Sequence, residues 1–189
     1  DRVCKNPIFG RVLGAIGMKI LVVDTETTKA PLCDPYNPNA RMCYVGLLND
    51  THTYVDYPIE YQDKPYGEAL KAIQQAVDGC DMLVGANIKF DLGWLRRYGI
   101  DFSKKRIWDV LLVQFILNNQ HTPYISLNDC AETYGLATKL DVVKQQYWEK
   151  GIDTPDIPPN ILRPYLKQDV LLTQQVFELQ HTRVGQQGI

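Results

Sequence analysis

A short apolar run, residues 20–23, leads directly into two carboxylates, Asp24 and Glu26, that are separated by one residue. In a β-strand, residues two apart point to the same face, so both carboxylates would project together from the end of a buried strand. Two carboxylates placed side by side repel each other unless a cation lies between them. Hard divalent cations prefer oxygen ligands, so the pattern predicts a metal site built on this strand.

Two predicted helices supply further candidate ligands. Asn87 and Asp91 are four residues apart at the start of one helix, and Tyr165 and Asp169 are four apart in the last one. That spacing puts the members of each pair on one helical face. Four carboxylates from three elements suit two divalent ions about 4 Å apart, the arrangement used for in-line displacement at phosphorus. One ion would activate a water, the other would stabilise the leaving oxygen, and a phenol would orient the water.

Each of these residues also has an ordinary structural explanation when it is taken alone. Asp24 could end a strand at a turn, and Glu26 could be a solvated loop charge. Asp91 and Asp169 could lie on exposed helical faces, and Tyr165 could fill the core with its hydroxyl at the surface. Their occurrence together, in this order and local context, favours the metal site over these separate explanations.

The order of apolar segments predicts a mixed α/β sheet with helices on its faces. Residues 18–24, 42–48 and 51–57 have strand patterns. The last two meet at Asn49-Asp50, which suits a tight hairpin turn and predicts an antiparallel meander of three strands. Short strands are then predicted over 82–86 and 106–108, and helices over 66–77, 87–98, 109–117, 126–135 and 161–180. In such folds the site commonly lies beyond the strand ends, where Asp24 and Glu26 are placed.

Two of the predicted helices begin with capping residues. Asp109 precedes an apolar helix and is expected to cap it, with a supporting position beside the metal site as the alternative. Ser126 is followed three residues later by Asp129, which is the position of a capping-box partner. Residues 137–160 are mixed in character and end in prolines, so we expect a lid or crossing segment there and no separate domain.

Composition limits the alternatives. The 189 residues are enough for one domain with a core, and no apolar stretch is long enough to span a membrane, so no membrane partner is expected. The net charge of −2 does not suggest non-specific coating of nucleic acid, but it allows an enzyme that meets phosphate through metals. The cysteines lack CxxC spacing and the histidines lack zinc spacing. This favours free thiols in a reducing compartment and argues against a zinc site.

The residues around the candidate ligands resemble the three motifs of the DEDD 3′→5′ exonucleases. Residues 24–27 (Asp-Thr-Glu-Thr) are similar to the first motif and residues 87–91 (Asn-Ile-Lys-Phe-Asp) to the second. Residues 165–169 (Tyr-Leu-Lys-Gln-Asp) are similar to the third motif in its tyrosine form, DEDDy, because the histidine form needs His where this chain has Pro164. Helices over 108–118 and 127–135 resemble those in the proofreading domain of family A DNA polymerases.

This resemblance implies a ribonuclease H-like fold and two Mg²⁺ or Mn²⁺ ions. By motif, Asp24 would bridge both ions, Glu26 and Asp169 would hold the ion that activates water, and Asp91 would support the second ion. Tyr165 would position the water. Three residues of the first two motifs would contact the 3′ end of the substrate strand: Thr25, Asn87 and Phe90.

The activity implied is hydrolysis of DNA from its 3′ end to nucleoside 5′-monophosphates. Single-stranded or frayed ends would be preferred, and the activity would proofread for a DNA polymerase domain or subunit. The alternatives are a DEDDy exoribonuclease similar to ribonuclease D, and a non-catalytic nucleic-acid-binding domain of the same fold. The second alternative is disfavoured because the chain retains all five motif residues.

The expected domain organisation follows the span of the motifs. Residues 18–183 are expected to form the exonuclease domain, residues 1–17 a leader or upstream extension, and residues 184–189 a tail. The expected location is the cytoplasm of a bacterial or phage-infected cell.

Overall fold

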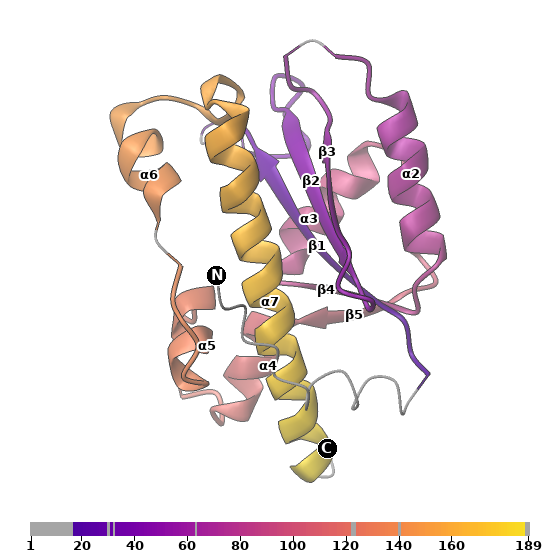
Figure 1. The fold of residues 1–189 in the computed structure, drawn as a ribbon, viewed down its shortest axis with the longest axis vertical. Helices are drawn as coiled ribbons and strands as arrows, with labels where there is room; N and C mark the ends of the chain where they lie inside the picture. Colours follow the sequence, from indigo (N-terminus) through magenta and orange to yellow (C-terminus); the bar gives the residue numbers. More distant parts are fainter. Residues whose placement is uncertain are drawn as a thin grey trace.

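Five strands form one sheet with the order β3-β2-β1-β4-β5, and helices cover both of its faces (Figure 1). The computed structural model describes residues 17–29, 31, 33–62, 64–121, 124–139 and 141–187. The strands are β1 (Ile20–Thr27), β2 (Met42–Asn49), β3 (Tyr54–Pro58), β4 (Met82–Gly85) and β5 (Arg106–Asp109). The α-helices are α2 (Gly67–Asp78), α3 (Ile88–Arg97), α4 (Val110–Leu117), α5 (Leu127–Thr133), α6 (Val142–Gln146) and α7 (Pro159–Gln187), with 3₁₀ turns η1 (Trp148–Lys150) and η2 (Thr154–Asp156).

The sheet is mixed, as the sequence predicted. Strand β1 pairs antiparallel with β2, which pairs antiparallel with β3. On its other side β1 pairs parallel with β4, and β4 pairs parallel with β5. The meander followed by parallel strands confirms the α/β, ribonuclease H-like fold class. It also places the central strand β1 between the two parts of the sheet.

Alternation along β1 divides the core into two layers. Ile20 and Val22 belong to the layer that packs against α7, whereas Leu21 and Val23 belong to the layer that packs against α2 and α3. Because side chains alternate along a strand, residues 24 and 26 continue the first series and residue 25 continues the second. The two carboxylates of β1 therefore lie on the α7 face.

Helix α7 lies across one face of the sheet, where it packs mainly against β1 and β2 (Figure 1). Its close approach depends on Gly46 of β2, because a Cβ at that position would lie 2.9 Å from Cγ of Leu166 and 3.1 Å from Cγ2 of Val170. Gly46 is the residue that pairs with Asp24 across β1 and β2. The missing side chain thus lets α7 pack directly opposite the first carboxylate.

The turn between β2 and β3 differs from the predicted tight hairpin. The connection spans residues 50–53, because Asn49 Oδ1 accepts hydrogen bonds from the backbone N–H groups of Thr51 and Thr53 at 3.1 and 2.8 Å. His52 in this turn has a φ of 61°. The Asn side chain therefore organises a wider loop, and β3 begins three residues later than predicted.

Two other predictions concern the ends of the chain and its long connection. Most of the predicted leader, residues 1–16, lies outside the described residues. Helix α7 starts at Pro159 and continues through residues 184–187, into the segment predicted as a tail. The predicted crossing segment carries α6, η1 and η2. In the part of the chain that the structure describes, no helix combines the length and apolar character needed to cross a membrane.

Both predicted helix caps are confirmed. Asp109 accepts hydrogen bonds from the N–H groups of Leu111 and Leu112 at the start of α4. Ser126 and Asp129 form a capping box at the start of α5, with donation in both directions. These caps satisfy N–H groups that a helix leaves unpaired at its first turn.

Candidate active site

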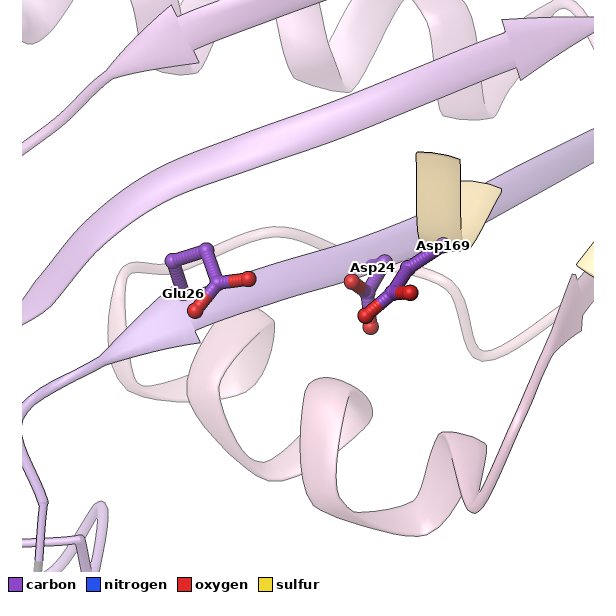
Figure 2. Close-up of side chains that lie close together, drawn as sticks. All are labelled: Asp24, Glu26 and Asp169. Carbon is purple, nitrogen blue, oxygen red and sulfur yellow. The ribbon is translucent and has the colours of Figure 1, made fainter. Parts of the chain in front are cut away.

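Three carboxylates from the first strand and the last helix come together at one point. Asp24 and Glu26 extend from β1, and Asp169 reaches them from α7 (Figure 2). One oxygen from each of the three lies within 4.8 Å of the others. Glu26 and Asp169 are buried, and Asp24 is half-buried. Hard divalent cations are held by carboxylate oxygens in such clusters, so the donor set fits one.

Asp91 lies beside this cluster and is anchored to the same strand. Its Oδ1 accepts a hydrogen bond from the backbone N–H of Thr25 at 2.9 Å and another from the Thr25 hydroxyl at 2.6 Å. Asp91 is 2% exposed. The two bonds tie the first turn of α3 to β1 between Asp24 and Glu26. They also use both donors of Thr25.

Burial raises the pKa values of these carboxyl groups. The pKa of Glu26 rises to about 8, mainly through burial. Burial also raises the pKa of Asp24, and the charges of Asp91, Asp169 and Glu26 raise it further. The pKa of Asp91 rises to about 7 through burial, although its bonds from Thr25 act in the opposite direction. Crowded buried carboxyl groups of this kind favour a bound cation or a bound proton.

Lys139 is a residue of the site that the sequence patterns missed. Its Nζ lies 2.7 Å from Oδ2 of Asp169 and donates to the Tyr165 hydroxyl at 3.3 Å. Burial raises the pKa of Asp169, and the Lys139 ammonium works against that effect. Lys139 lies between α5 and α6, in the segment predicted to be a lid. Its place in that segment is the one feature of the sequence that pointed to a role for Lys139 near the site.

Tyr165 lies one helical turn before Asp169 and is held by the segment that connects α5 to α7. Its hydroxyl donates to Oδ1 of Asp141 at 3.2 Å. Its ring meets the Trp148 ring edge-on, with centroids 5.8 Å apart. Burial raises the pKa of the phenol, so it stays protonated near neutral pH. The phenol therefore keeps its proton, which it donates to Asp141, and its oxygen accepts a hydrogen bond from Lys139 beside the carboxylate cluster.

The same connecting segment also contacts the chain just beyond β1. The backbone N–H of Lys29 donates to Oδ1 of Asp153 at 2.8 Å. The Lys29 ammonium lies 3.4 Å from the centre of the Trp148 ring. Cation–π contacts of this kind hold a charged side chain against an aromatic face. Residues 141–153 thus pack against both Tyr165 and the end of β1.

The remaining candidates lie at the start of α3. Asn87 precedes the helix with a φ of 56°, in the left-handed region, and its backbone N–H donates to Oδ1 of Asp109 at 3.1 Å. Its side chain makes no capping bond and the residue is exposed. Phe90 is half-buried and meets the Trp94 ring edge-on. Asp109 therefore caps α4 and also holds Asn87 beside the site.

Comparison with known protein families gives one match that covers most of the chain. Residues 15–180 match the family model DNA_pol_A_exo1, described as 3′-5′ exonuclease. Members of exonuclease families generally use divalent metals, in agreement with the carboxylate cluster described above. A comparison with curated protein sequences finds no match.

Solved structures with the same fold include two nucleic-acid-related proteins. The family B DNA polymerase of the archaeon Pyrobaculum calidifontis matches with a TM-score of 0.57 and 13% identity, over 87% of this chain and 24% of the polymerase chain. NrnC of Brucella melitensis bound to pGG matches with a TM-score of 0.60 and 16% identity, over 93% of this chain and 78% of NrnC. This chain thus spans about a quarter of that polymerase.

Proposed function

Because the chain belongs to the 3′-5′ exonuclease family whose model it matches over residues 15–180, we propose that it hydrolyses DNA from the 3′ end to nucleoside 5′-monophosphates. The observation that carries the proposal is the meeting of Asp24, Glu26 and Asp169, with one oxygen from each within 4.8 Å. A three-carboxylate cluster next to a fourth buried acid is suited to phosphodiester hydrolysis with metal ions.

The four acidic residues, Asp24, Glu26, Asp91 and Asp169, have different roles in metal binding in the proposed mechanism. Asp24 would contribute to both metal positions, Glu26 and Asp169 would hold the ion on their side, and Asp91 would support the second. Two bound Mg²⁺ or Mn²⁺ ions would supply an activated water and stabilise the leaving oxygen. The bonds from Thr25 fix the Asp91 carboxylate before any ligand binds. Asp91 would therefore need little rearrangement relative to β1 when metal ions bind.

Tyr165 defines the proposed subtype. The residue before it is Pro164, so a histidine cannot act from that position. The Tyr165 hydroxyl lies within hydrogen-bonding distance of Asp141 and Lys139, which hold the phenol next to Asp169. We assign this phenol the task of orienting the attacking water, as in the DEDDy form. Asn87 and Phe90 lie at the adjacent start of α3, where they would contact the terminal nucleotide.

The partner proposed for this activity is a DNA polymerase domain or subunit. The family name refers to polymerases, and the polymerase from Pyrobaculum calidifontis carries the same fold within a much longer chain. A proofreading site acts on a 3′ end that has separated from its template. We therefore expect a preference for single-stranded or frayed ends.

The experiment that tests the proposal compares DNA and RNA strands of one sequence, each labelled at the 5′ end. With Mg²⁺ or Mn²⁺ present, the labelled strand should shorten stepwise from its 3′ end, and DNA should shorten faster than RNA. Asp24→Ala should lower the rate on the order of a thousandfold, because it removes a ligand shared by both metal positions. Asp50→Ala is the matched control, since Asp50 is exposed in the turn after β2.

Three results would contradict parts of the proposal. Undiminished cleavage by Asp24→Ala would reject the assigned site, and undiminished cleavage in EDTA would reject the metal mechanism. Faster loss of RNA would replace the DNA substrate with RNA. The likeness to NrnC bound to pGG is the reason for including the RNA strand.

A further inference from the structure

A groove of about 870 Å³ opens near the end of β1. Its walls come from the loop before β2, the segment between β3 and α2, and the end of α3. Arg41, on the first wall, is joined to the residue just past β1: the Thr28 N–H donates to the Arg41 carbonyl at 3.0 Å, and the Arg41 N–H donates to the Thr28 hydroxyl at 3.0 Å. Thr28 is two residues beyond Glu26, so the groove lies near the end of β1, on the side of the sheet that α2 and α3 cover, whereas the carboxylates of β1 lie on the α7 face.

Positive charge dominates this groove. Arg41, Lys64 and Arg97 line it, and Glu60 is the one acid among its lining residues. All three cations are exposed, and no carboxylate of the described residues lies within 4.0 Å of them. Glu60 instead accepts a hydrogen bond from the Tyr66 hydroxyl at 3.4 Å. A concave surface lined by one sign of charge concentrates the opposite charge, so the groove is suited to an anionic ligand.

Arg97 is fixed in position before a ligand arrives. Its Nη1 donates to the carbonyls of Pro35 and Asn37 at 3.1 and 2.8 Å. Its guanidinium also lies 5.4 and 5.8 Å from the centres of the Trp94 and Tyr98 rings. These contacts leave the Nε and Nη2 donors without a partner among the described residues. A guanidinium held in this way is suited to phosphate, which it can bind through two parallel hydrogen bonds.

The groove also offers an aromatic surface. Tyr66 lines it and is half-buried, with its ring set edge-on to Tyr98 at 6.0 Å. Proteins that bind single strands commonly combine cations along the backbone with aromatic rings on which bases stack. Three cations and one ring in a groove near the end of β1 match that combination.

Resting on the proposed function, we propose that this groove binds the phosphate backbone of the single strand, 5′ of the nucleotide that is removed. The strand must enter the carboxylate cluster with its 3′ end, so its upstream phosphates need a path away from four acidic residues. Arg41 lies next to the end of β1, and Lys64 lines the same groove, so the two cations offer a path around the strand end toward the face that α2 and α3 cover. The other basic stretch, residues 104–106, lies before and at the start of β5, and its Lys105 is already bonded to the carbonyls of Asp78 and Cys80.

The experiment compares two substrates of the intact protein. One is an oligothymidylate of about 12 nucleotides, long enough to reach the groove. The other is the p-nitrophenyl ester of thymidine 5′-monophosphate, which has no upstream phosphates. For the double variant Arg41→Ala/Lys64→Ala, KM for the oligonucleotide should rise on the order of tenfold, with kcat retained. Both parameters for the ester should stay at the parent values.

Salt dependence gives an independent measurement. The slope of log(kcat/KM) against log[salt] for the oligonucleotide should become shallower by about 0.7 for each phosphate that the double variant no longer neutralises. The matched control is Lys71→Ala/Lys104→Ala, which removes the same charge from exposed positions outside the groove. This control should keep the parent slope and the parent KM.

The outcomes separate the two proposals. An oligonucleotide KM that rises no more than in the control rejects the groove, while cleavage of both substrates by the parent protein upholds the exonuclease. An equal loss of activity on both substrates also rejects the groove, because the variant would then act on the catalytic site itself. A parent protein that cleaves neither substrate with metal present rejects the proposed function on which the groove rests.

Discussion

Lys139 brings a positive charge to a place where acidic side chains meet. Its ammonium contacts Asp169 and the Tyr165 hydroxyl, and its side chain is 16% exposed. In the absence of metal, it is the closest described cation to Asp169. Metal ions held by the same acid would supply the same compensation. We therefore expect Lys139 to matter most for the stability of the metal-free protein.

Replacing Lys139 with Met tests this expectation. In EDTA the free energy of unfolding should fall by roughly 1.5–3 kcal/mol, the range for hydrogen bonds to charged groups. With saturating Mn²⁺ the difference from the parent should shrink, and urea denaturation measures both values. Lys144→Met is the control, since Lys144 is exposed in the same segment. Equal destabilisation with and without Mn²⁺ would show that Lys139 contributes through packing alone.

The carboxylates and Lys139 differ in how far sequence reasoning could find them. Asp24 and Glu26 follow from strand alternation, and Asp169 follows from its helical spacing to Tyr165. The bond from Lys139 to Asp169 joins two segments whose approach depends on the tertiary fold. No periodicity relates these positions, so the pairing had no local pattern. The same reason explains why the double donation from Thr25 to Asp91 was missed.

At the level of elements, Gly46 sets the distance between α7 and the sheet. A methyl group there would meet Leu166 and Val170 at 2.9–3.1 Å, closer than van der Waals contact allows. Helix α7 carries Asp169, while β2 pairs Gly46 with Asp24. The position of Asp169 relative to Asp24 thus depends on the missing side chain of Gly46.

Gly46→Ala should therefore weaken both packing and catalysis. Overpacking of a core costs typically 1–3 kcal/mol, and a small displacement of a catalytic group can cost tenfold or more in rate. We expect a lower free energy of unfolding by about that amount and a fall in kcat on the order of tenfold. Gly67→Ala serves as the control, because a Cβ at Gly67 meets nothing within 4 Å. Parent values of kcat in Gly46→Ala would refute the spacing argument.

Most elements were predictable because their patterns are local. The apolar run of β1, the face of α2 and the caps at Asp109 and Ser126 each depend on neighbouring residues. The wide turn after Asn49 was not predicted, because Asn-Asp pairs also suit tight hairpins and the deciding bonds come from Thr51 and Thr53. The short helices between α5 and α7 lack the periodicity that reveals longer ones.

At the level of the whole molecule, the acidic cluster links stability to pH and to metal. In the folded protein the pKa of Glu26 is about 8 and that of Asp91 about 7, against ordinary values of 4.5 and 3.8. Between about pH 4 and pH 8 the folded, metal-free protein therefore holds more protons than the unfolded chain. The stability that these groups contribute is present at the low end of this window. It is lost as the pH rises through 7 and 8.

Thermal unfolding at pH 6 and pH 8, with and without Mn²⁺, tests this linkage. In EDTA the acidic cluster should make Tm lower at pH 8 than at pH 6. Mn²⁺ should raise Tm more at pH 8 than at pH 6, because deprotonated carboxylates bind metal better than protonated ones. At a metal concentration about 100 times Kd the gain should be about 2.7 kcal/mol. Asp24→Asn should lose most of this gain. An equal rise in Tm at both pH values would contradict the linkage.

The position of the carboxylates along the chain has a consequence for protein synthesis. Asp24 stands in the first strand and Asp169 in the last helix, while β1 also needs β4, a much later segment, as its parallel partner. A chain still growing on the ribosome presents its β1 acids long before the helix that supplies the third acid is made. The three-carboxylate cluster can therefore assemble only after α7 has been made, so a partly synthesised chain that lacks α7 would lack the proposed catalytic site.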